Sequence, residues 1–300
     1  MSPSYLLVLL GVAMVSYSGP LVKGALMAGA NPVTVAALRM AFSALLLLPL
    51  LFMRNREHER PVRALGRITR KQWLWSLAAS LFLAFHYLSW MTSLDATSTF
   101  ASVALVCTQP LFVAALSGLV LREPMARRAR PGAAVALLGA ALIGLNSLAG
   151  LSGDFRGDLL ALLGAACMAG HWLCSRYARR TTAALPFAFL LYTQTALLLL
   201  LLSPLCGGLR VTARALWYIL GLAAGCTLLG HQLFTVALGR VSATVVSFAL
   251  LGEPVGAMVW SMMMFGEHPT PLLLAGGFVT LLGLALYLLG SGHPEAQIKG

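Results

Sequence analysis

The chain has 300 residues, of which 59% are hydrophobic and only 10% are charged, and its mean hydropathy is +0.85. A soluble domain carries about 25% charged residues, so the composition excludes a soluble protein and predicts an all-α polytopic membrane protein. The net charge of +12 does not indicate nucleic-acid binding, because the basic residues lie in short connections between apolar segments and not on one folded face.

Ten apolar segments are each long enough to cross a bilayer, which takes about 20 residues. No Lys or Arg precedes Lys23, so we interpret the first segment as a retained span and not as a cleaved signal peptide. In chain order the predicted spans are 4–22, 32–53, 72–93, 96–120, 131–149, 157–178, 183–205, 213–236, 241–265 and 270–290. The basic segment 54–71 is the only sizeable connection.

The fourth and ninth spans share an unusual pattern of helix-breaking residues. Gln109 and Pro110 lie in the middle of the fourth span, and Glu253 and Pro254 lie in the middle of the ninth, 144 residues further on. The same spacing relates two further pairs, Glu123 with Glu267 and Gly139 with Gly283. A duplication with breakers at matching midpoints points to the binding site of a transporter.

The distribution of basic residues predicts how the spans are oriented. If the N-terminus is cytoplasmic, the inner connections and the C-terminus hold sixteen Lys and Arg and the outer connections hold four, so both termini are predicted to be cytoplasmic. Five spans per half is an odd number, so the halves must be inverted relative to each other. We therefore expect ten transmembrane helices as two inverted five-helix repeats, 1–149 and 150–300.

Glu253 is the most informative polar residue of the ninth span. A carboxylate at the middle of a span costs several kcal/mol unless it is paired, hydrated or protonated, which makes it a candidate functional group. Pro254, like Pro110, removes a backbone donor, which is tolerated only beside protein or a water-filled cavity. The alternative is a kinked packing helix whose glutamate is simply neutral.

Other polar and aromatic residues inside the spans give the remaining candidates. Arg39 either snorkels or pairs within the bundle, or it binds a substrate carboxylate. The histidines are either satisfied interior donors or take part in binding. The predicted substrate-binding residues are Arg39, His86, Tyr87, Trp90, Gln109, His171, Trp172, His231 and Glu253, with Pro110 and Pro254 as helix breakers; further aromatic candidates for a cavity wall are Phe100, Tyr192, Phe234 and Trp260.

Several kinds of site are absent from the sequence. It contains no phosphate-binding loop of the G-x-x-x-x-G-K-[ST] type, no H-E-x-x-H and no G-x-S-x-G, so ATP hydrolysis and the familiar hydrolase motifs are excluded. The five cysteines lie in apolar segments without metal-ligand spacing. We expect no catalytic residues, no metal and no cofactor.

The chain resembles the drug/metabolite transporter superfamily, and within it the EamA-type exporters. The resemblance covers essentially the whole chain and is carried by Arg39 in the second span and by three short motifs, Leu121-Arg122-Glu123-Pro124, Gly252-Glu253-Pro254 and Gly266-Glu267-His268-Pro269-Thr270. It implies alternating access around a central cavity lined by spans 1, 3, 4, 6, 8 and 9. It does not specify the substrate, because relatives move amino acids, metallophores, sugars and drugs.

The sequence therefore predicts a secondary transporter of the bacterial inner membrane that exports a small metabolite, such as an amino acid, a metallophore or a drug. Its expected partners are that solute and the bilayer, with protons as a further candidate through Glu253, whose neutral form burial favours. We expect a monomer or a weak homodimer. Two alternatives stay open: a solute channel or facilitator, and an intramembrane enzyme that uses the histidines with Glu253.

Overall fold

The computed structural model describes residues 3–53, 65–66, 68–116, 125–179, 182–230, 233 and 249–290. These residues are all-helical and contain no strand. Nine helical segments in this part of the chain are long and apolar enough to span a membrane: Leu6–Met27, Pro32–Phe52, Arg70–Ala96, Thr99–Leu116, Arg127–Leu148, Phe155–Ala178, Ala184–Cys206, Ala213–Gly230 and Pro271–Gly290. The prediction of an all-α, multi-pass protein is confirmed.

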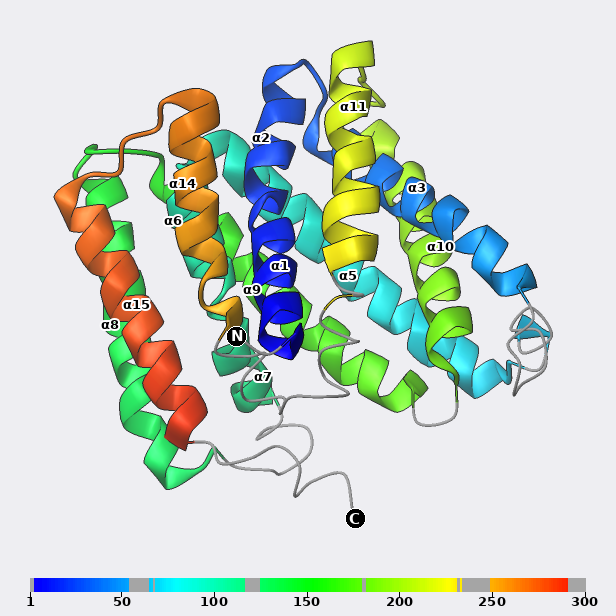
Figure 1. The fold of residues 1–300 in the computed structure, drawn as a ribbon, viewed down its shortest axis with the longest axis horizontal. Coiled ribbons are helices and arrows are strands. Elements are labelled where there is room, and N and C mark those ends of the chain that lie inside the picture. The colour runs from blue at the N-terminus through cyan, green and yellow to red at the C-terminus, as the bar shows by residue number, and fades with distance from the viewer. Residues whose placement is uncertain are drawn as a thin grey trace.

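The helices form one bundle (Figure 1). They are α1 (Pro3–Ser16), α2 (Ser18–Met27), α3 (Pro32–Phe52), α5 (Arg70–Ala96), α6 (Thr99–Val106), α7 (Gln109–Leu116), α8 (Arg130–Leu148), α9 (Phe155–Arg179), α10 (Ala184–Leu202), α11 (Ala213–Gly221), the π-helix η4 (Leu222–Gly230), α14 (Glu253–Phe265) and α15 (Pro271–Gly290), with short 3₁₀ turns at Arg127–Ala129 and Ser203–Cys206. Most of the predicted ninth span before Glu253 lies outside the described residues.

Three of the predicted spans are interrupted in the structure. The first is divided at Tyr17 between α1 and α2, and the fourth is divided at residues 107–108 between α6 and α7. The eighth changes from α-helix to π-helix after Gly221. Interruptions of this kind are common at functional sites.

Five connections gather at one end of the bundle, which we call the pocket end. They comprise residues 28–31, 95–98, 149–154, 207–212 and 266–270. Asn31 Nδ2 donates to Gly208 O over 2.7 Å, and Thr212 Oγ1 donates to Ala28 O over 2.7 Å. The described basic residues Arg70, Arg130 and Arg179, at the other ends of α5, α8 and α9, lie at the opposite end of the bundle, so consecutive helices alternate in direction.

Equivalent helices of the two repeats pack against each other in antiparallel pairs. On α8 and α15, Gly139 lies against Thr280 and Ala136 lies against Gly283. A Cβ atom on Gly283 would overlap the backbone of Ala136, so this close approach requires glycine. The most extensive contacts between described helices are α5 with α9, α8 with α15 and α3 with α10.

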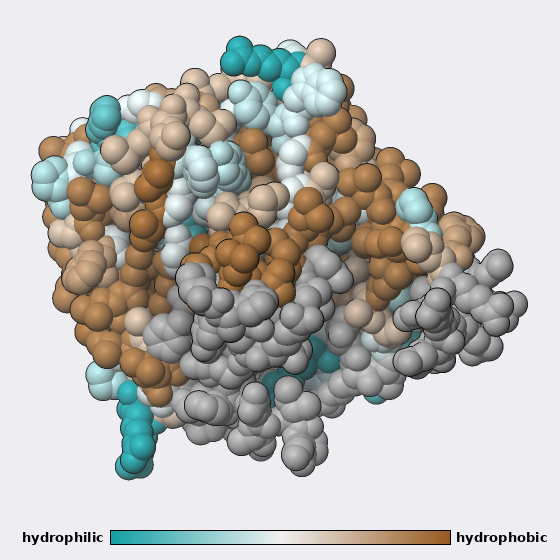
Figure 2. Space-filling view, in the orientation of Figure 1, coloured by the Kyte–Doolittle hydropathy of each residue, from teal (hydrophilic) through white to brown (hydrophobic). Residues whose placement is uncertain are grey.

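The outer surface of the bundle is largely apolar (Figure 2). Leu201 and Trp217 expose 76% of their surface and Phe278 exposes 68%. Exposed apolar area on this scale is unfavourable in water. The surface therefore fits a bilayer, as the composition predicts.

Candidate functional site

Arg39 lies at the centre of the bundle. It is on α3 with only 4% of its surface exposed. Its Nε donates to Thr227 Oγ1 over 2.9 Å and its Nη1 donates to Ser18 Oγ over 3.1 Å. The Tyr87 ring lies under the guanidinium, with its centroid 5.0 Å from Cζ. Arg39 is thus held by α2, α5 and η4, all of which reach it from different sides.

No acid neutralises this guanidinium within the part of the chain that the structure describes. Both hydrogen bonds go to hydroxyl groups, and they use two of the five N–H groups of the side chain. Three N–H groups therefore have no partner among the described residues. Because removing an ion from water costs several kcal/mol, an unneutralised buried arginine is a strong anion-binding group.

Glu253 supplies the opposite charge but does not touch Arg39. The two side chains are close enough to interact electrostatically, yet no hydrogen bond or ion pair joins Glu253 to a described residue. Glu253 is the first residue of α14, where the helix dipole favours a negative charge. The bundle interior thus holds a guanidinium and a carboxyl group that are near each other and form no ion pair with any described residue.

The two helix breaks lie next to each other in the fold. α7 begins at Gln109 after the turn at residues 107–108, and α14 begins at Glu253 after the turn at residues 251–252, so the spacing of 144 residues is kept. Pro110 and Pro254 occupy the second position of their helices, where a missing N–H costs nothing. Cys107 and Leu251 pack in the same apolar cluster, which brings the two breaks together.

Aromatic rings form a wall beside Arg39. The Tyr87 and Trp90 ring centroids are 6.4 Å apart, and the Trp90 ring stacks on His86 at 5.8 Å. Trp90 is buried, and its Nε1 has no hydrogen-bond partner among the described residues. Tyr192 of α10 interacts electrostatically with Arg39 and Tyr87. This wall offers an apolar surface and one unused donor.

The two described histidines of the candidate set join α5 to α9. His86 Nδ1 lies 2.9 Å from Gly164 O, and His171 Nδ1 lies 3.1 Å from Ala79 O. A carbonyl oxygen only accepts, so each Nδ1 carries the hydrogen. Both rings are therefore interior donors that tie the two helices together, which is the structural alternative that the sequence left open.

The remaining candidates are not all brought together. Trp172 is 50% exposed, although its ring lies edge-on to the ring of the buried His171 with centroids 5.5 Å apart, so it is not part of the Arg39 cluster. Trp260 packs on Tyr17 with centroids 4.0 Å apart and donates to Ser16 Oγ. The candidates His231 and Phe234 and the motif Leu121-Arg122-Glu123-Pro124 lie outside the described residues.

Two partners of Arg39 were missed in the sequence. Ser18 follows the break at Tyr17, and Thr227 lies in the π-helix, where its hydroxyl also donates to Leu222 O over 3.0 Å. Small hydroxyl residues are common in apolar spans, so neither is conspicuous by itself. The only sequence signal for Ser18 is Gly19-Pro20, which follows it, and the only signal for Thr227 is the nearby Gly225. Glycine and proline are common where a helix is irregular.

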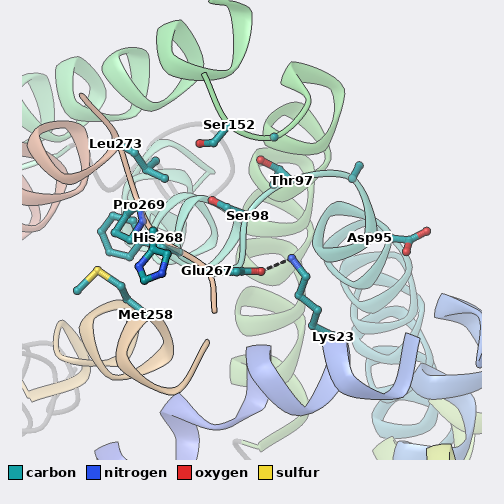
Figure 3. Close-up of a pocket in the computed structure, with 13 residues that line it drawn as sticks. Lys23, Asp95, Thr97, Ser98, Ser152, Met258, Glu267, His268, Pro269 and Leu273 are labelled. Carbon is teal, nitrogen blue, oxygen red and sulfur yellow. Dashed lines mark hydrogen bonds and ion pairs between the residues drawn. The ribbon is translucent and has the colours of Figure 1, made fainter. Parts of the chain in front are cut away.

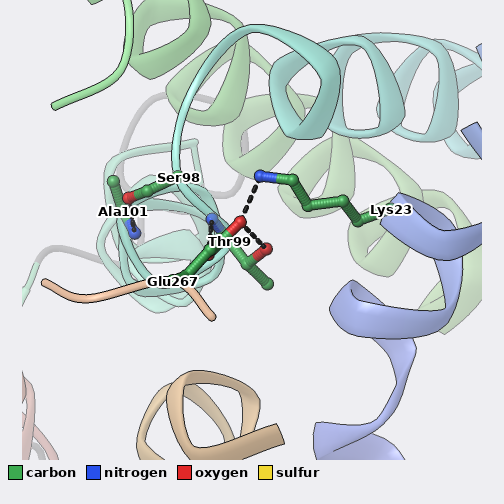
Figure 4. Close-up of polar contacts among 5 residues, drawn as sticks. All are labelled: Lys23, Ser98, Thr99, Ala101 and Glu267. Carbon is green, nitrogen blue, oxygen red and sulfur yellow. Dashed lines mark hydrogen bonds and ion pairs between the residues drawn. The ribbon is translucent and has the colours of Figure 1, made fainter. Parts of the chain in front are cut away.

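A separate pocket opens at the pocket end (Figure 3). Its volume is about 340 Å³. It is lined by Lys23, the 95–98 connection, Phe100, Ser152, Gly153, Met258, the 267–269 segment and Leu273. Lys23 and Glu267 form an ion pair there, and Glu267 also accepts from Thr99 N over 3.2 Å (Figure 4).

Comparison with solved structures supports the overall fold. Fifteen chains match. One, titled only as the crystal structure of a protein, aligns with a TM-score of 0.65 at 16% identity and covers 97% of this chain and 99% of its own. At this identity the similarity concerns the fold alone. A search of curated proteins finds no match.

The family comparison is specific. The model of the EamA-like transporter family matches residues 2–145 and again residues 155–289, which is nearly the whole chain. The match comprises two copies of the family's repeat, one in each half. This protein therefore belongs to the EamA-like transporter family, within the drug/metabolite transporter superfamily, and is a multi-pass membrane transporter.

Proposed function

We propose that this protein is a secondary transporter that exports a small carboxylate-bearing metabolite, an amino acid or a related compound, across the bacterial inner membrane by alternating access. The observation that carries the proposal is the buried guanidinium of Arg39, which is bonded to two hydroxyl groups and to no described acid. A carboxylate that binds its free N–H groups supplies the missing charge and strong charge-assisted hydrogen bonds.

The surroundings of Arg39 suit such a solute. Glu253 is near enough to attract a positive group on the same molecule. Tyr87 and Trp90 provide an apolar wall for the rest of it. Three further residues complete the proposed site from its edges. His86 and His171 hold α5 on α9. Gln109 is the first residue of α7, as Glu253 is the first residue of α14.

The antiparallel packing of α8 on α15 and of α3 on α10 supports inverted repeats, 1–149 and 150–300. Two equivalent helices that are related by a two-fold axis in the membrane plane run in opposite directions, as inverted-repeat transporters require. The basic count puts the pocket end outside and both termini in the cytoplasm. A cytoplasm-active reporter fused to Gly300 tests this orientation, and loss of its signal would contradict it.

Counterflow in liposomes tests the transport proposal. Purified protein is reconstituted with unlabelled amino acids inside, and labelled amino acids are added outside one at a time. We expect saturable accumulation of at least one of them by the parent protein and none by Arg39→Ala. Linear, unsaturable flux would instead support a channel, and chemical conversion of the solute would support an enzyme.

A further inference from the structure

The pocket at the outer end of the proposed transport route has its own charged groups. Lys23 is on α2 and Glu267 is in the connection between α14 and α15, so the pair joins the first half of the chain to the second. It is the only ion pair between residues that the structure describes. Both side chains are about one-fifth exposed, at 22% and 20%, so they are reachable from the pocket.

Both groups keep hydrogen-bonding capacity. The ammonium group of Lys23 has three N–H donors, and Glu267 is its one partner among the described residues. The Glu267 carboxylate accepts from Lys23, from Thr99 Oγ1 over 3.2 Å and from Thr99 N over 3.2 Å. A carboxylate has about four acceptor positions, so one position is left. The pocket thus offers free donors beside a free acceptor (Figure 4).

Asp95 is the only further Lys, Arg, Asp or Glu among the residues that line the pocket, and His268 lies beside Glu267 (Figure 3). Phe100, Met258 and Leu273 form an apolar side, and Ser98 and Thr97 provide hydroxyl groups. Asp95 lines the rim but is exposed and points away from the pair (Figure 3). The volume of about 340 Å³ lies within the range of small-molecule sites.

We propose that this pocket is a second solute site, which binds small zwitterions with an apolar side chain, their carboxylate on Lys23 and their ammonium group on Glu267. The charges of Lys23 and Glu267 already balance each other. A solute with only one charge would leave one of these charges uncompensated, whereas a zwitterion satisfies both. The role of this pocket as an exit site rests on the proposed transport function. The binding of a zwitterion in the pocket does not.

The position of the pocket relative to Arg39 fits an exit site. Lys23 follows Ser18, the partner of Arg39, by five residues on α2, which is about 7.5 Å along the helix axis. In the second half of the chain, Glu267 lies just beyond the C-terminal end of α14, and Glu253 is the first residue of the same helix. A zwitterion that replaces the direct contact between Lys23 and Glu267 therefore also loosens the link between the two halves at this end.

Binding measured in the Arg39→Ala background isolates the outer pocket from the central site. The full-length protein is titrated in detergent with leucine, with 3-methylbutylamine and with 4-methylpentanoate, which share the branched apolar group and differ in charge. We expect leucine to bind, and the amine and the acid to bind at least about tenfold more weakly, since each lacks one charged hydrogen bond.

Variants of the pair test the assignment of residues. Adding Lys23→Met or Glu267→Gln should abolish leucine binding, whereas Lys23→Arg should retain it. Lys71→Met, an exposed lysine at the opposite end, is the matched control and should bind like the background protein. Unfolding midpoints measured without leucine show whether each variant is folded, and Glu267→Gln carries the test if Lys23→Met does not fold.

Absence of leucine binding in the Arg39→Ala background, or unchanged binding after Lys23→Met in folded protein, would overturn the proposal. Counterflow separates this failure from a failure of the transport function. If the parent protein transports while the pocket variants bind leucine unchanged, only the second site is wrong. If the parent protein transports nothing but the pocket binds leucine, the site stands and its role as an exit does not.

Discussion

Two pairs of opposite charges in this protein are arranged in different ways. At the pocket end, Lys23 and Glu267 are in direct contact and partly exposed. In the centre, Arg39 and Glu253 attract each other but are not joined, and Arg39 is almost completely buried. A partly exposed pair contributes little stability because water screens it. Unpaired buried charges are costly, and their retention indicates that something else completes them.

We propose that the two pairs of charged residues have different roles. The outer pair holds the halves of the chain together by a contact that is weak enough to exchange. Arg39 and Glu253 form no ion pair with any described residue. In this proposal both are therefore available to a solute.

Replacing Arg39 should have the largest effect on transport. Arg39→Ala removes one partner of a buried charged contact, which costs about 2–5 kcal/mol. We therefore expect kcat/KM to fall by about 30-fold or more, since each 1.36 kcal/mol is about tenfold. Initial rates of counterflow in liposomes measure this, with Arg156→Ala, an exposed arginine at the pocket end, as the control.

Two results would contradict a role for Arg39 in solute binding. Normal counterflow by Arg39→Ala would remove this residue from the solute site. Loss of folded protein, seen as aggregation in size-exclusion chromatography, would instead show that Arg39 has a structural role through Ser18 and Thr227.

Glu253 should be required at its own position, and an acid at the equivalent position 109 of the first half should not replace it. Glu253→Gln makes the two breaks chemically alike, and loss of one charged hydrogen bond, about 1.5 kcal/mol or more, should reduce transport about tenfold or more. Exchanging the residues, Gln109→Glu with Glu253→Gln, should not restore activity, because Arg39 belongs to only one half. Full recovery by the exchanged variant would show that either break can carry the acid.

Glu253 also bears on energy coupling. We propose that its charge affects solute binding more than proton coupling, because no second described acid lies beside it. Glu253→Gln should then slow solute exchange and proton-driven accumulation alike. If accumulation fails while exchange is intact, Glu253 is the coupling residue.

The smallest effect should come from the hydroxyl group that orients Arg39. Thr227→Val keeps the shape of the side chain but removes the acceptor of the 2.9 Å bond from Nε. A hydrogen bond of this kind contributes about 1 kcal/mol, so we expect KM to rise about fivefold with little change in kcat. Thr280→Val, which loses only a bond to Gly276 O within its own helix, should behave like the parent; equal KM values for both variants would contradict the prediction.

The class of fold and the positions of its irregularities could be predicted from the sequence. Apolar length requires membrane-spanning helices, because an unpaired backbone is too costly in lipid. Proline has no N–H to donate, so Pro110 and Pro254 fit the first turn of a helix, where no N–H is needed. The spacing of 144 residues is kept in the structure by the turns at residues 107–108 and 251–252. These features depend on local chemistry and are readable from the chain alone.

Which side chains meet could not be predicted, because it depends on how the helices pack in three dimensions. Arg39 is 188 residues from Thr227, and Lys23 is 244 residues from Glu267. Nothing local specifies these contacts. Helices that are apolar on all sides also carry no periodic pattern to show which face points inward. For this reason His171 and its neighbour Trp172 were equivalent candidates in the sequence, although one is buried and the other is half exposed. Packing between helices, which fixes the rotation of each, made that distinction.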